Sequence, residues 1–238
     1  MHDEHIAAAF DRDLEALQAL MMKMGGLVED AIGNAARSLE MRDAELAEEV
    51  RAGDRAIDGL EERINQDAAR IIALRQPAAV DLRVVLAVMK VSGNLERIGD
   101  YAKNIAKRTT ILADMPEIGG APGAIRRMTA EVQRMLKDVL DALVARDAEL
   151  AGDVIARDAD VDQMYNALFR EFLTFMMEDP RNITACMHLH FIAKNIERMG
   201  DHVTNIAEQV IYLTTGEIPE EPRPKGDRTS TDPGVAPA

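Results

Sequence analysis

Aromatic residues are scarce in this sequence: Phe, Trp and Tyr together make up 3% of it, and there is no Trp. Hydrophobic residues still reach 47%, so the core must be aliphatic, with 14 Met beside Ala, Leu, Ile and Val. A β-sandwich relies on β-branched and aromatic residues, whereas packed helices accommodate this composition well. The composition therefore favours an all-α fold.

Cysteine, long apolar runs and positive charge are also in short supply. The one cysteine, Cys186, excludes an intramolecular disulfide and a Cys-rich zinc or iron–sulfur site. The strongly apolar run 84–89 is far shorter than the roughly 18 residues of a membrane span, and the acidic residues 1–5 do not resemble a signal peptide. We therefore expect a cytoplasmic protein. The formal net charge of −14 disfavours sequence-independent binding to nucleic acid.

Apolar residues recur along the chain at spacings of three, four and seven, which is typical of amphipathic helices. We expect a first bundle of three helices in residues 1–114, a Pro- and Gly-rich linker at 115–123, a second bundle of three helices in 124–215 and a disordered tail at 216–238. Gly25 and Gly26 interrupt the first helix and predict a kink or a close helix contact there. The predicted helices span about 10–39, 44–74, 80–112, 124–146, 148–177 and 183–215.

The two halves of the chain are similar in sequence. The segment NLERIGD at 94–100 matches NIERMGD at 195–201 with an offset of 101 residues, and both continue into Asn-Ile-Ala. The segment RDAELA at 42–47 recurs unchanged at 146–151. Because the matches fall at corresponding positions, we interpret the chain as two copies of a three-helix unit.

Four pairs of acidic residues stand four positions apart, two pairs in each half. Residues at i and i+4 share one face of a helix with side chains about 5–6 Å apart, and like charges there are mildly destabilising. Their repetition suggests that cations lie between them, and oxygen ligands suit iron, manganese, magnesium, calcium or zinc. The candidate metal ligands are Asp54, Asp58, Glu96, Asp100, Asp158, Asp162, Glu197 and Asp201.

The helical angle predicts where these acids point. The mean direction of Glu96 and Asp100 lies about 160° from the apolar stripe of their own helix, at roughly 100° per residue. We therefore expect a metal on the bundle surface, where Asp54 and Asp58 meet Glu96 and Asp100. The alternative interpretation is a solvated acidic face, which is the usual position of carboxylates.

The sequence resembles the PhoU family of phosphate-system regulators. The motifs that carry the resemblance are MGGLV at 24–28, QPAAVDLR at 76–83, LERIGDYAKNIA at 95–106 and IERMGDHVTNIA at 196–207. The resemblance covers about residues 5–215 and implies two tandem three-helix bundles. It also implies multinuclear iron or zinc clusters on the eight acids named above, with manganese or magnesium as other options.

The resemblance further implies a role and partners. PhoU proteins are cytoplasmic adaptors, often homodimeric, that associate at the membrane with the phosphate transporter Pst and the sensor histidine kinase PhoR. They repress the phosphate-starvation response and are not established enzymes. Two alternatives stay open from the residues alone: a metal-dependent enzyme that uses the carboxylates, and a structural bundle without a ligand. A ferritin-like di-iron enzyme is disfavoured, because no Glu in the helical body has a His three residues later.

Overall fold

The computed structural model describes residues 2–217, in which six long helices, one short 3₁₀ turn and no strand are found. Residues 218–238, and with them most of the predicted disordered tail, lie outside this range. The α-helices are α1 His2–Met41, α2 Ala44–Arg75, α3 Val80–Leu112, α4 Ala121–Ala145, α5 Ala148–Glu178 and α6 Ile183–Thr215, with the 3₁₀ turn at Pro180–Asn182. The all-α prediction is confirmed.

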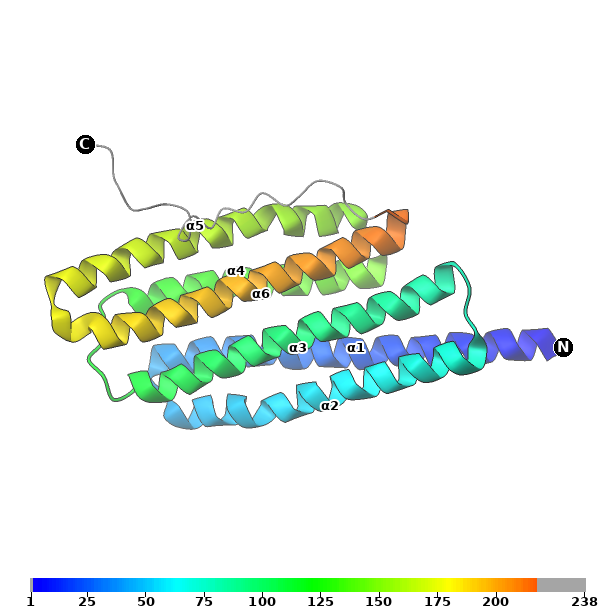
Figure 1. Ribbon diagram of the computed structural model, residues 1–238, viewed down its shortest axis with the longest axis horizontal. Coiled ribbons are helices and arrows are strands. Elements are labelled where there is room, and N and C mark those ends of the chain that lie inside the picture. Colours follow the sequence, from blue (N-terminus) through cyan, green and yellow to red (C-terminus); the bar gives the residue numbers. More distant parts are fainter. Residues whose placement is uncertain (1, 218–238) are drawn as a thin grey trace.

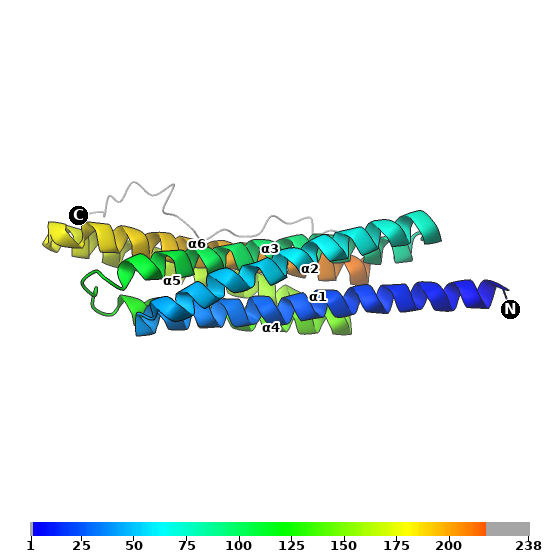
Figure 2. The same cartoon turned by 90° about the horizontal axis from the view of Figure 1, so that it is seen from below.

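The six helices form two layers. In Figure 1, α2, α3, α6 and α5 lie side by side in that order, and Figure 2 shows α1 and α4 together on the opposite side. The packing partners agree with this view, since α3 contacts α6, α1 contacts α4, and α2 and α5 take the edges of the four-helix layer. The two halves are therefore packed against each other through α3 with α6 and α1 with α4.

The core is continuous across both halves. One cluster of buried aliphatic side chains joins all six helices, from Met24 and Ile32 on α1 to Met135 on α4 and Ile196 on α6. Burial of this apolar surface is the main stabilising contribution to such a bundle. The packed helices hold in place the polar side chains that lie between them.

The repeated Arg-Asp-Ala-Glu-Leu-Ala segment folds in the same way in both halves. Arg42 and Arg146 each adopt the left-handed conformation with a φ of 54°. The carboxylates of Asp43 and Asp147 then accept hydrogen bonds from backbone N–H groups in the first turns of α2 and α5. Side-chain caps of this kind satisfy donors that have no partner within the helix.

The predicted boundaries differ from the structure mainly at the linker. Helix α4 begins at Ala121, earlier than expected, with Pro122 in its first turn. Proline is well tolerated there because the first N–H groups of a helix have no partner inside it. The connection between α3 and α4 is therefore shorter than the predicted linker 115–123.

Helix α1 continues without a break through Gly25 and Gly26, and these two glycines differ in role. A Cβ at Gly25 would lie 2.7 Å from Cδ1 of Leu140 on α4, whereas one at Gly26 would meet nothing within 4 Å. Gly25 thus permits the close approach of α1 to α4. The expectation of a close helix contact is confirmed for Gly25 and wrong for Gly26.

We predict that Gly26→Ala stabilises the protein by about 1 kcal/mol, because alanine favours the helix and space is available. Gly25→Ala should stabilise it less or not at all, because Leu140 must move. Urea unfolding followed by circular dichroism measures both changes. Equal stabilisation by the two substitutions would contradict the close α1–α4 contact.

Candidate metal centre

In the first half, the four predicted acids converge where α2 packs along α3. Asp54 of α2 and Asp100 of α3 both contact Nζ of Lys103, at 2.5 Å and 3.4 Å. Asp54 is buried, with 3% of its surface exposed, whereas Asp58 is exposed and Glu96 is half-buried. The charges of Asp54 and Asp100 act on Asp58, and those of Asp58 and Asp100 act on Glu96, so the four acids lie near one another. We refer to these four residues as the first cluster.

The pKa values of two acids report this crowding. Although Asp58 reaches solvent, partial desolvation of its carboxylate raises its pKa above the ordinary value, and the charges of Asp54 and Asp100 raise it further, against a lowering by Lys103. Burial likewise raises the pKa of Glu96, with Asp100 as the next cause. Like charges that are close together disfavour ionisation. The first cluster is therefore an unfavourable concentration of negative charge, which a cation would relieve.

In the second half, the corresponding acids lie where α5 packs along α6. Asp162 and Glu197 are buried, with 5% and 6% of their surface exposed, while Asp158 and Asp201 are half-buried. A carboxylate oxygen of Asp158 lies only 2.8 Å from the position that a Cβ at Gly200 would take. Asp158 of α5 is therefore held directly against the backbone of α6, next to Asp201. These four residues are the second cluster.

The expectation that the acids lie outside the apolar core on the bundle surface needs one correction. Asp54, Asp162 and Glu197 are shielded from solvent, so they are not part of a solvated face. The reason is the packing of the helices in one layer: α2 covers one flank of α3, and α5 covers one flank of α6. The direction of a side chain around its own helix does not show whether a neighbouring helix covers it.

Lysines near both clusters were not considered at the sequence level. Lys103 binds Asp54 and Asp100, and hydrogen bonding to Asp54 raises the pKa of Lys103 above its ordinary value. Lys194 lies 2.9 Å from Glu197, three residues along the same helix. The three-residue spacings from Asp100 to Lys103 and from Lys194 to Glu197 were available signals, because such residues share a helix face.

Among the described residues, no three His, Cys, Asp or Glu side chains already stand in a metal-binding arrangement. Two features of the first cluster nevertheless fit a bound cation. Oδ1 of Asp54 is buried and has no hydrogen-bond partner, although a buried polar atom normally has one. Lys103 also shows that the first cluster accepts positive charge. Oxygen ligands of this kind are those preferred by hard metal ions, so the residues fit a metal.

The glycines of the Glu-Arg-x-Gly-Asp motifs make room beside the carboxylates. A Cβ at Gly99 would lie 3.1 Å from Ile57 and 3.8 Å from Oδ1 of Asp54, and the contact at Gly200 with Asp158 is closer still. Gly99 therefore permits the close approach of α2 to α3, and Gly200 leaves space for a carboxylate of α5. A larger residue at Gly200 would displace the Asp158 carboxylate.

His202, which follows Asp201 in sequence, belongs to the contact between the two halves. Its Nδ1 lies 2.8 Å from Oδ1 of Asn94 on α3, and the amide of Asn205 donates to the same oxygen at 3.3 Å. The His202 ring also lies beside Tyr101, with 5.7 Å between ring centroids. These contacts position α6 against α3, and so hold the two clusters in a fixed relation.

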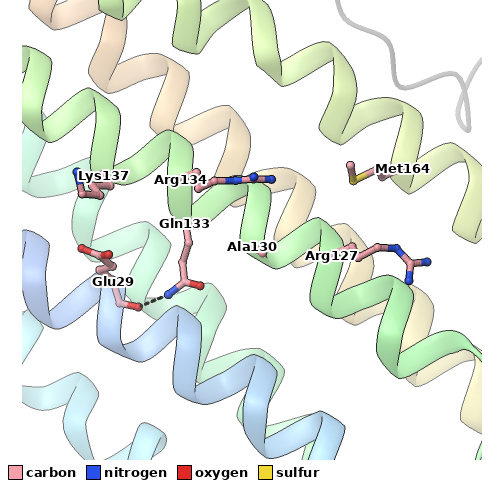
Figure 3. A pocket seen from close by; sticks show the side chains of 7 residues that line it. All are labelled: Glu29, Arg127, Ala130, Gln133, Arg134, Lys137 and Met164. Atoms are coloured by element: carbon pink, nitrogen blue, oxygen red, sulfur yellow. Dashed lines mark hydrogen bonds between the residues drawn. The ribbon is translucent and has the colours of Figure 1, made fainter.

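A hollow of about 530 Å³ lies beside α4, and none of the eight acids lines it (Figure 3). Arg127, Arg134 and Lys137 point into it, with Gln133 donating to the backbone carbonyl of Glu29. Arg134 is paired with Glu131, and Lys137 is paired with Asp141. Acids on the same helix therefore already neutralise two of the three cations that line the hollow.

We predict that Asp58→Asn stabilises the metal-free protein at neutral pH, because it removes a negative charge that is repelled by the other acids of the first cluster. A raised pKa in the folded state means that the folded protein takes up the proton first as pH falls. The difference in melting temperature between the variant and wild type, measured in chelator, should therefore shrink as pH falls toward 4. A variant less stable than wild type at pH 7 would show that Asp58 makes a favourable contact instead.

We also predict that Gly200→Ala destabilises the protein, although alanine favours a helix by about 1 kcal/mol. The added methyl group would collide with the Asp158 carboxylate. Gly93→Ala is the matched control, because a Cβ there meets nothing within 4 Å. Chemical unfolding compares the two, and an equal gain in both variants would show that Asp158 is free to move away.

Comparison with known proteins gives a consistent result. The PhoU domain model matches residues 21–109 and 125–210, once in each half. The chain is 48% identical over 224 residues to a "Phosphate-specific transport system accessory protein PhoU homolog" of Caulobacter vibrioides, covering 94% of this chain and 97% of the relative. A protein of the same name from Zymomonas mobilis is 50% identical over 222 residues, covering 93% of each chain.

Solved structures show the same fold. The crystal structure of PhoU from Pseudomonas aeruginosa superposes with a TM-score of 0.85 at 40% identity, covering 87% of this chain and all of that one. The phosphate transport system regulatory protein PhoU from Streptococcus pneumoniae gives a TM-score of 0.82 at 31% identity, covering 89% of this chain and all of that one. With both halves matched and the fold shared, this chain belongs to the PhoU family.

Proposed function

We propose that this protein is a cytoplasmic adaptor that links phosphate uptake to phosphate signalling. In this role it docks on the Pst phosphate transporter and on a PhoR-type sensor histidine kinase, and it represses the starvation response when phosphate is plentiful. The observation that carries the proposal is its alignment, over nearly its full length, with relatives named as accessory proteins of the phosphate-specific transport system. Their name supports a role at the transporter; the kinase and the repression are our extension.

The shape of the molecule suits an adaptor. The six helices form a long, rigid body with broad helical faces (Figure 1). None of the described helices is long and apolar enough to cross a membrane. Association with a transporter would therefore take place through protein contacts. We include a homodimer in the proposal, because a symmetric pair would present each docking face twice.

We further propose that both clusters hold metal ions, with iron, zinc, manganese or magnesium as the candidates. The support is the interaction of the four acids in the first half, the unpartnered buried oxygen of Asp54, the burial of Asp162 and Glu197 in the second half and the space left by Gly200 for Asp158. A bound metal would neutralise the acids and tie α2 to α3 and α5 to α6. Metal binding would then stiffen the two edge helices of the four-helix layer.

An enzymatic role finds less support. Catalysis by a metal requires a pocket with an open coordination position and a nearby base. The hollow beside α4 is separate from the eight carboxylates, and two of its three cations, Arg134 and Lys137, are already paired with acids. The names of the relatives describe accessory and regulatory proteins. We therefore propose a regulatory scaffold and not a catalyst.

We predict that deletion of the gene leaves phosphate-starvation genes expressed in high phosphate, and that the wild-type chain restores repression. A reporter fused to a starvation promoter measures this. A variant with Glu96, Asp100, Glu197 and Asp201 all changed to Ala should restore less repression if metal supports signalling.

Two controls accompany this prediction. Pull-down from membranes in high and low phosphate tests whether the wild-type chain and the variant still reach the transporter and the kinase. Circular dichroism shows whether the variant is folded. Normal repression in the deletion strain would reject the signalling role, and full activity of the folded variant would reject the contribution of metal.

A further inference from the structure

Lys103 connects the two helices that carry the acids of the first cluster. Lys103 lies on α3 one turn after Asp100, and its ammonium group contacts Asp100 on its own helix and Asp54 on α2. The same lysine thus bridges the two helices whose acids form the cluster. Lys103 supplies one positive charge and Arg97, 3.7 Å from Glu96, supplies a second, so the four carboxylates keep an excess of negative charge.

The contact with Lys103 satisfies Asp54 only in part. Oδ2 of Asp54 accepts from Lys103, while the buried Oδ1 has no hydrogen-bond partner. Asp54 is 4% exposed at its side chain, but Lys103 is 41% exposed. One partner is therefore fixed inside the protein, and the other is a flexible chain that reaches solvent and has room to leave.

A metal ion and the lysine would need the same two carboxylates, those of Asp54 and Asp100. Metal ions bind carboxylate oxygens at about 2.0–2.6 Å, so an ion on Oδ1 of Asp54 would lie within a few ångströms of the ammonium group on Oδ2 and would be repelled by it. The two cations therefore compete. In the second half, the residue at the position of Lys103 is Thr204, whose hydroxyl donates to the backbone carbonyl of Asp201 at 2.8 Å.

We propose that Lys103 is a built-in counter-ion of the first cluster, which competes with metal for Asp54 and Asp100 and so weakens metal binding in the first half. This inference rests on the proposed metal role of the clusters. With metal absent, the lysine reduces the repulsion between α2 and α3. With metal present, the ammonium group must move out, so the first cluster needs a higher metal concentration for binding than it would without Lys103.

The test is a titration with Mn²⁺ in which the EPR signal of the free ion reports binding. The parent is the full chain with Asp162→Asn and Asp201→Asn, so that the first cluster dominates the signal. Lys103→Met removes the competing charge. Lys107→Met removes an equal charge from the exposed next turn of α3 and is the matched control.

We expect Lys103→Met to bind Mn²⁺ about tenfold more tightly than the parent, because it removes a like charge a few ångströms from the ion. Lys107→Met should bind as the parent does. In chelator, the melting temperature of Lys103→Met should lie below that of Lys107→Met, and saturating Mn²⁺ should reverse this order. Lys103→Gln, which keeps a polar side chain, should also bind more tightly than the parent.

The possible results distinguish the role of Lys103 from the metal role of the clusters. Equal or weaker binding by folded Lys103→Met and Lys103→Gln, compared with a parent that does bind, would overturn the role of Lys103 and leave the metal role intact. No binding by any of these variants, and none by the wild-type chain with both clusters, would overturn the metal role and the inference that rests on it.

Discussion

The structure depends on a conflict between packing and charge. Its core packs α2 against α3 and α5 against α6, and the eight acids lie on these four helices, three of them buried. Packing alone does not require carboxylates there, and like charges in partly buried positions are unfavourable. Their placement makes physical sense if positive charge is supplied from elsewhere. The first cluster already shows one source of it, the side chain of Lys103.

Duplication explains the arrangement of the rest of the molecule. The two halves pack with α3 beside α6 and α1 beside α4, and His202 and Asn94 join them across this contact. The two clusters therefore belong to one rigid body. Neutralising the negative charge of either cluster changes the repulsion felt by an edge helix, α2 in the first half and α5 in the second. In the regulation that we propose, a change in charge at these helices alters the surfaces that partner proteins contact.

Much of this could be predicted from the sequence, because the signals were local. Helix periods, Pro77, Gly216 and the repeated Glu-Arg-x-Gly-Asp motifs fix the helices, and i,i+4 spacing places each pair of acids on one face. The burial of Asp54 and Glu197 was missed because it depends on a neighbouring helix. The pairing of Lys103 with Asp54 was missed for the same reason, since these residues are far apart in sequence.

The most direct test of the central claim is a crystal structure of the protein purified without chelator, with anomalous diffraction recorded at the absorption edges of iron, zinc and manganese. The account predicts anomalous peaks within bonding distance of the carboxylates between α2 and α3 and between α5 and α6. If the crystals showed no peak at either place, with the acids bound only to Lys103, Lys194 and water, the claim that the clusters exist to hold metal would be contradicted.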